Sequence, residues 1–174
     1  GAQFPYLSAN LDFSQDFDVG PLFTDEILPS TDFESDLLSA RDDPNDPSVR
    51  GSDSNDIKGA QATVIDVDGE KVGVVGATTQ LIASISSPGN IDDVSSPGTN
   101  DMAALAAVLQ PVIDDLIDGD DDTLGTADDV NKIVLVSHLQ QFALEEELAG
   151  LLRGVDVIIA GGSDTINADP QDRL

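Results

Sequence analysis

The stretch KIVLVSH, residues 132–138, is an apolar run that ends in His138, the only histidine in the chain. Residues 141–153 follow with leucines at helical spacing, and a second apolar run, residues 155–160, leads into GGSDT at 161–165. The order strand, helix, strand predicts a βαβ unit with a right-handed crossover and two parallel strands. The carboxyl ends of both strands are therefore expected at one edge of the sheet, where open α/β sheets bind ligands.

A second pattern, upstream of the first, predicts a β-hairpin. Residues 62–67 and 70–75 are rich in Val and flank Asp68-Gly69, a dipeptide typical of a two-residue type I′ turn. Apolar residues then recur at helical spacing over 101–118, which predicts an amphipathic helix with one face on the sheet. Together these patterns predict an α/β fold whose mixed sheet contains a β-hairpin and a βαβ unit.

Long loops rich in acidic residues separate these elements. The loops are expected over residues 12–56 and 118–131, and the first contains scattered apolar residues that suggest partial packing. A short strand is expected over residues 4–11, and a short helix over residues 80–85. The length of 174 residues fits one domain with a sizeable core.

The charge of the chain is strongly negative. It has 34 Asp and Glu residues against 7 Lys and Arg residues, a formal net charge of −27. So few basic residues do not supply the positive field that a nucleic acid polymer or an anionic membrane surface requires, so neither is expected as a partner. Such acidity suits a protein that is soluble at high salt or that binds divalent cations. No apolar run approaches the roughly 20 residues of a membrane span, and the absence of Cys excludes disulfides and thiolate metal sites.

The acidic loop at 118–131 is a candidate calcium site. Asp118, Asp120 and Asp122 have the i, i+2, i+4 spacing of an oxygen-ligand loop, and Asp128 follows in the same loop. The glycine and the glutamate that complete an EF-hand loop are not at their expected places. A solvated acidic loop explains the same residues, and the sequence leaves both interpretations open.

Four segments occur in the order in which a known enzyme family has them. They are FPYLSAN (4–10), KVGVVGATT (71–79), VSHL (136–139) and GVDVIIAGGS (154–163). The combination resembles the 5′-nucleotidase branch of the calcineurin-like metallophosphoesterases. The resemblance implies that residues 1–174 form a single partial domain of an αββα sandwich. It also implies two divalent metal ions, which clamp a phosphate and lower the pKa of a bridging water.

The same resemblance assigns two candidate metal ligands. His138 matches a family histidine that ligates the second metal from a strand end. The family motif Gly-His-Ser-His-Thr aligns with residues 161–165, where Gly162 replaces the first histidine and Asp164 replaces the second. Asp164 is thus the other candidate, and an oxygen ligand favours calcium, magnesium or manganese over zinc. From the residues alone, a polar residue that caps a strand is the favoured interpretation of a lone histidine such as His138, and the resemblance reverses that preference.

The remaining family motifs, Asp-x-His and Gly-Asn-His-Glu, do not occur in these 174 residues. The leading hypothesis is therefore the central segment of a secreted phosphoesterase that hydrolyses phosphomonoesters or nucleotides and is inactive as the isolated chain. Its partner would be the remainder of a longer parent chain, in an extracellular, cell-surface or periplasmic location. The alternative is a non-catalytic, calcium-stabilised subunit of an extracellular filament, appendage or surface layer, which would contact identical subunits. No catalytic or substrate-binding residue is assigned at this point.

Overall fold

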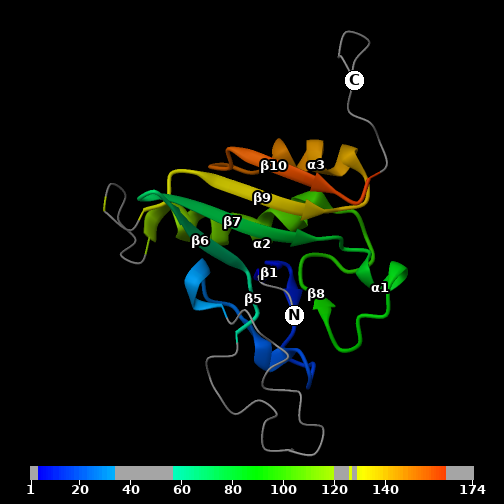
Figure 1. The fold of residues 1–174 in the computed structure, drawn as a ribbon. Helices are drawn as coiled ribbons and strands as arrows, with labels where there is room; N and C mark the ends of the chain where they lie inside the picture. The colour runs from blue at the N-terminus through cyan, green and yellow to red at the C-terminus, as the bar shows by residue number, and fades with distance from the viewer. Residues whose placement is uncertain (1–3, 34–56, 120–125, 127–128, 164–174) are drawn as a thin grey trace, which may run out of the picture.

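The computed structural model describes residues 4–33, 57–119, 126 and 129–163. Its main feature is a five-stranded mixed sheet with helices on one face (Figure 1). The strand order is β10-β9-β7-β6-β4, with parallel pairs except for the antiparallel pair β6–β7. The strands span Val157–Gly161 (β10), Ile133–His138 (β9), Glu70–Thr78 (β7), Ala62–Val67 (β6) and Leu28–Pro29 (β4). The predicted fold class is confirmed.

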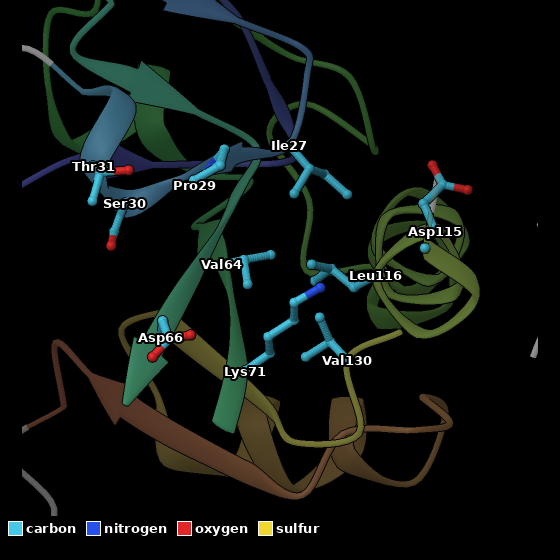
Figure 2. Close-up of a pocket in the computed structure, with 11 residues that line it drawn as sticks. Ile27, Pro29, Ser30, Thr31, Val64, Asp66, Lys71, Asp115, Leu116 and Val130 are labelled. Carbon is cyan, nitrogen blue, oxygen red and sulfur yellow. The ribbon is translucent and has the colours of Figure 1, made fainter. Parts of the chain in front are cut away.

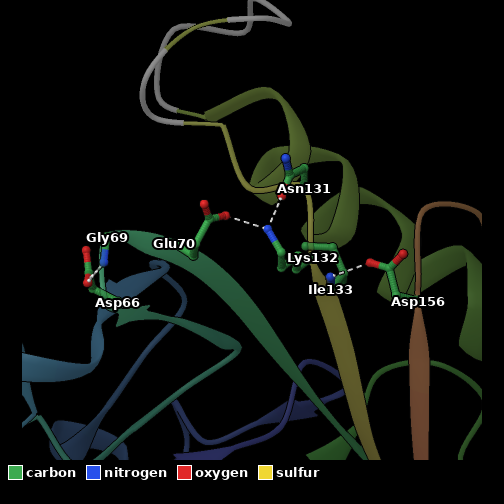
Figure 3. A network of polar contacts seen from close by, with 7 residues as sticks. All are labelled: Asp66, Gly69, Glu70, Asn131, Lys132, Ile133 and Asp156. Atoms are coloured by element: carbon green, nitrogen blue, oxygen red, sulfur yellow. Dashed lines mark hydrogen bonds and ion pairs between the residues drawn. The ribbon is translucent and has the colours of Figure 1, made fainter.

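The predicted hairpin joins β6 to β7. Asp68 and Gly69 both have positive φ, 55° and 87°, as a type I′ turn requires. The Gly69 amide donates to the Asp66 carboxylate at 2.8 Å, and the Lys132 ammonium donates to Glu70 at 2.6 Å beside the turn (Figure 3). These contacts fix the end of the hairpin to the start of β9.

The predicted βαβ unit consists of β9, helix α3 (Phe142–Ala149) and β10. Its strands are parallel, with Leu135 opposite Ile158 and His138 opposite Gly161. The long helix α2 (Met102–Asp118) connects β7 to β9 on the same face of the sheet (Figure 1). Its N-cap is Asp101, whose carboxylate accepts from the Ala104 amide at 2.9 Å.

The core lies between this helix layer and the sheet. Gly73 on β7 is needed for the close approach, because a Cβ there would lie 2.8 Å from Ile133 and 3.1 Å from Leu116. Side chains from alternate strand positions and from both helices form one buried cluster; it includes Ala62, Val75, Ile133, Leu135, Leu105, Leu109, Ile113, Leu116 and Leu148. Among the helices of the described residues, none combines the length and the apolar character needed to cross a bilayer.

The amino-terminal part differs from the expected single strand over 4–11. It forms two strands, β1 (Tyr6–Leu7) and β2 (Leu11–Asp12), in different sheets. Strand β1 pairs with β5 (Gly59–Ala60), which also pairs with β3 (Phe23–Thr24), while β2 pairs with β8 (Asp92–Asp93). The chain changes partner here because the Asn10 side chain bonds to the main chain of β7.

Short elements occupy stretches that the sequence assigned to loops and longer helices. The described part of 12–56 contains η1 (Gly20–Leu22) and η2 (Ser30–Asp32) as well as β3 and β4. Helix α1 covers only Ile82–Ile85. Helix α3 ends at Ala149, earlier than the predicted 153, because Gly150 is a poor helix former.

Candidate metal-binding edge of the sheet

The imidazole of His138 lies at the carboxyl edge of the sheet, against the turn that follows β10. Gly161 is its register partner, and the next residue, Gly162, has a positive φ of 82°. A Cβ at Gly162 would collide with the Cδ2 and Nε2 atoms of His138. Glycine therefore allows the exposed ring to rest on the turn. The predicted convergence of the two strand ends is confirmed.

Gln140 is the nearest polar partner of this ring, and no sequence pattern pointed to it. Its amide nitrogen lies 3.0 Å from Nε2 of His138. Which of the two groups donates in this contact depends on the tautomer of the ring. Gln140 is one of two non-glycine residues with positive φ among the described ones, at 73°. Such backbone conformations are uncommon outside glycine and concentrate at functional sites.

Glu145 of α3 supports the carboxyl end of β9. The acidic run at 145–147 predicts a solvent-exposed helix face for all three residues, but Glu145 is buried, with 3% of its surface exposed. Its Oε1 accepts from the Leu139 amide at 3.2 Å and lies 3.4 Å from the Ser137 hydroxyl. Ser137 and Leu139 flank His138, so this carboxylate contacts both neighbours of the imidazole, the side-chain hydroxyl of Ser137 and the backbone amide of Leu139.

A buried polar network holds the neighbouring end of β7. Thr78 is the register partner of His138 on that strand. The fully buried Asn10 donates to the Thr78 carbonyl at 2.8 Å and accepts from the Thr78 amide at 2.8 Å. Asn10 also donates to Asp93 at 2.7 Å, and Asp93 in turn accepts from the Ser95 hydroxyl at 2.7 Å. The network is satisfied at each of these atoms, so it makes the strand end rigid.

Within the residues that it describes, the structure places none of the other predicted ligands at this edge of the sheet. Asp118 is the last residue of α2, half-buried and followed by Gly119 with a φ of 66°. The remaining predicted ligands lie outside the described residues: Asp120, Asp122 and Asp128 of the calcium proposal and Asp164 of the strand edge.

A complete two-metal centre does not fit the described residues. Within the described ranges, no group of three or more His, Asp or Glu side chains is placed so that it could hold a metal ion. Among the described residues, His138 is the one predicted ligand at the sheet edge, and two metal ions need several more. We therefore derive no reaction step through a metal from these residues.

Carboxylates elsewhere on the surface have structural partners. The pKa of Asp16 is lowered chiefly by the Val19 amide, and that of Asp12 by hydrogen bonds from Ser14. The pKa of Glu70 is lowered by its hydrogen bond from Lys132 and by the charge of that ammonium. Asp12 and Asp16 thus close turns of the chain.

One cavity of the structure is at the other end of the sheet from His138. It has a volume of about 290 Å³ and lies between β4, the hairpin and the end of α2 (Figure 2). Lys71 extends into it toward Leu116 and Val130, and Asp66 lies at its rim (Figure 2). Since Lys71 and Asp66 belong to the turn end of the hairpin, this cavity is separate from the histidine edge.

Comparison with known proteins points to one class of enzyme. No protein-family model matches the chain. It is 34% identical over 104 residues to a 5′-nucleotidase of Diplobatis ommata, covering 60% of this chain and 15% of that protein. It is 33% identical over 123 residues to a 5′-nucleotidase of Mus musculus, covering 67% of this chain and 18% of that protein. With the trifunctional nucleotide phosphoesterase protein YfkN of Bacillus subtilis, the identity is 31% over 106 residues, 59% of this chain and 6% of that protein.

Comparison with solved structures points to the same class of enzyme. The crystal structure of a 5′-nucleotidase precursor from Thermus thermophilus matches with a TM-score of 0.53 and 25% identity, over 91% of this chain and 20% of that chain. The chain thus spans less than a fifth of the length of the curated relatives described above. Sequence and fold together show that the chain corresponds to a partial segment of a 5′-nucleotidase-like metallophosphoesterase.

Proposed function

We propose that this chain is part of a metal-dependent phosphoesterase that hydrolyses phosphomonoesters, with nucleotides as the favoured substrates, and that His138 ligates one of its metal ions. The observation that carries the proposal is the imidazole held at the carboxyl edge of a parallel strand pair, against the Gly162 turn. The named activities of the relatives support the substrate class.

The described residues of this chain position one ligand. Glu145 fixes the backbone beside His138, and Asn10 fixes the adjacent end of β7. When bound, two divalent ions would clamp the phosphate oxygens and activate a water molecule. Because one described histidine cannot hold two ions, we propose that the isolated 174-residue chain has no turnover.

Calcium binding and an extracellular or periplasmic location belong to this proposal as well. The net charge of −27 supports both, since divalent cations or high salt relieve the self-repulsion of such a chain. A calcium-dependent rise in the midpoint of thermal unfolding, lost when Asp118 is replaced by Asn, is the expected result for the 118–131 loop. An unchanged midpoint at saturating calcium would contradict the calcium part.

Phosphatase assays test the catalytic proposal. The 174-residue chain and the product of the complete reading frame that encodes it are assayed with AMP and p-nitrophenyl phosphate, with Mg²⁺, Mn²⁺ or Ca²⁺. We expect no hydrolysis by the short chain and metal-dependent hydrolysis by the complete product. His138→Ala should lower that activity by more than the roughly 100-fold that supporting residues at metal sites contribute. The matched control Glu147→Gln, exposed on α3, should leave it unchanged.

Two results would contradict the proposal. One is metal-dependent hydrolysis by the short chain, which would show that its own residues complete the site. The other is a complete product that hydrolyses neither substrate with any of the three metals. The filament or surface-layer alternative gains no support from the relatives described above, since their names are those of nucleotidases and a nucleotide phosphoesterase.

A further inference from the structure

The cavity at the hairpin end of the main sheet is large enough for a small organic molecule. Its volume is about 290 Å³, and it lies between β4, the β6–β7 hairpin and the end of α2 (Figure 2). Since one water molecule takes roughly 30 Å³ of the liquid, this space holds about ten waters or a ligand of roughly ten non-hydrogen atoms. The cavity is separate from the His138 edge, so its occupant is not the phosphate ester of the proposed reaction.

The walls of the cavity are mainly aliphatic. They include Ile27 from the segment before β4, Val64 from β6, Leu116 from α2 and Val130 from the segment before β9. Leu116 and Val130 are each 2% exposed and belong to the hydrophobic core, so the cavity reaches the core at its floor. Among the described residues that line the cavity, none is aromatic, which favours an aliphatic chain over a nucleobase or another flat ring.

Lys71 is the one basic residue among the described residues that line the cavity. It lies on the α2 side of β7, because it shares the face of Gly73, where a Cβ would lie 3.1 Å from Leu116. Its side chain extends toward Leu116 and Val130 and carries the ammonium between these aliphatic walls (Figure 2). An ammonium in such surroundings loses part of its hydration, so a carboxylate beside it forms a strong, charge-assisted hydrogen bond.

Two carboxylates at the rim restrict the charge that a ligand can carry. Asp66, the register partner of Lys71, is exposed and accepts from the Gly69 amide at 2.8 Å. Asp115 is exposed on α2 and also lines the cavity. Both belong to a chain with a net charge of −27, so a dianion such as a phosphomonoester meets repulsion that a single ammonium does not offset. A monoanion with an aliphatic tail is the ligand class that fits the walls, the cation and the rim.

We propose that this cavity binds a small aliphatic monocarboxylate, with the carboxylate on the Lys71 ammonium and the tail against Val64, Leu116 and Val130. The site goes beyond the proposed function, because none of its residues belongs to the histidine edge of the sheet. A monocarboxylate of about eight non-hydrogen atoms, at the efficiency typical of small ligands, binds with a dissociation constant on the order of 0.1–1 mM.

Calorimetric titration of the complete reading-frame product with hexanoate tests the proposal. Three probes of the same chain length separate the parts of the ligand: 1-hexanol lacks the charge, hexylammonium reverses it, and adipate adds a second carboxylate. We expect each of them to bind roughly tenfold or more weakly than hexanoate, because each loses the ion pair with Lys71 or meets the rim carboxylates. No binding of hexanoate up to about 10 mM, or hexylammonium that binds as tightly as hexanoate, would overturn the proposal.

Two variants locate the site, with circular dichroism confirming the fold of each. Lys71→Met keeps an aliphatic stem and removes the charge, so hexanoate should bind roughly tenfold or more weakly. The matched control Lys132→Met removes an exposed ammonium that pairs with Glu70 outside the cavity, and it should leave the dissociation constant within about twofold. Unchanged hexanoate binding in Lys71→Met would overturn the proposal.

Phosphatase activity measured on the same preparations separates this proposal from the proposed function. Hexanoate binding that depends on Lys71 in a product without phosphatase activity would refute the proposed function and leave the cavity site standing. An active phosphatase that binds no hexanoate would refute the cavity site and leave the proposed function standing.

Discussion

Replacing Asn10 with Ala should strongly destabilise the protein, because this side chain joins three parts of the fold. Asn10 is fully buried and donates to the Thr78 carbonyl and to Asp93, while it accepts from the Thr78 amide. The substitution removes two neutral hydrogen bonds, worth about 1 kcal/mol each, and one to a carboxylate, worth about 2 kcal/mol. It also leaves the Thr78 groups without these partners inside the protein. We expect a loss of about 3–5 kcal/mol, a large fraction of a typical domain's stability of roughly 5–15 kcal/mol.

Urea unfolding followed by circular dichroism measures this loss by linear extrapolation. The matched control is Asn131→Ala, since Asn131 is exposed and its side chain accepts only from Lys132 among the contacts drawn in Figure 3. The control should lose about 0.5 kcal/mol or less. A loss below about 1 kcal/mol for Asn10→Ala would refute the view that this network holds the strand end beside His138.

Three further substitutions test the turn and the edge of the sheet. Gly69→Ala should cost about 1 kcal/mol, because its φ of 87° is unfavourable for Ala while the surrounding space is empty. Gly162→Ala should lower the free energy of unfolding by more, about 2–3 kcal/mol, and should shift the NMR signals of the single imidazole, because the new Cβ collides with His138. Equal losses for the two glycine variants, with unmoved imidazole signals, would contradict the packing of the His138 ring on the Gly162 turn. Lys132→Gln should raise the pKa of Glu70 toward its ordinary value, as followed by carboxyl NMR. Since the folded-state pKa of Glu70 is lowered, its contribution to stability is present at neutral pH and is lost as the pH falls through that pKa. The free energies of unfolding of wild type and variant should therefore differ at neutral pH and converge in acid. A difference that stays constant with pH would contradict the stabilising ion pair of Glu70 and Lys132.

The main elements of the fold could be predicted because their signals are local. Asp68-Gly69 requires a turn with two positive φ values, and the structure has them. The two apolar runs around α3 could only form a parallel pair through a right-handed crossover. The same topology places His138 beside the glycine turn without any knowledge of side-chain contacts.

The supports of the site were harder to predict because they depend on tertiary contacts. Asn10 meets Thr78 and Asp93 across separations of 68 and 83 residues, and no local pattern signals such a network. The predicted solvent exposure of Glu145 was wrong, and helical spacing could have shown that this residue is buried. It lies three residues before the buried Leu148 on the same helix, so the two side chains share one face, where Oε1 of Glu145 accepts hydrogen bonds at the end of β9.

Anomalous diffraction from crystals of the complete reading-frame product grown with Mn²⁺ tests the central claim most directly. We expect an anomalous peak about 2.0–2.3 Å from a ring nitrogen of His138, at the carboxyl edge of β9 and beside Gly162. The peak should disappear in His138→Ala while the fold remains. Manganese bound elsewhere in the protein, with no peak at this imidazole, would contradict the assignment of His138 as a metal ligand.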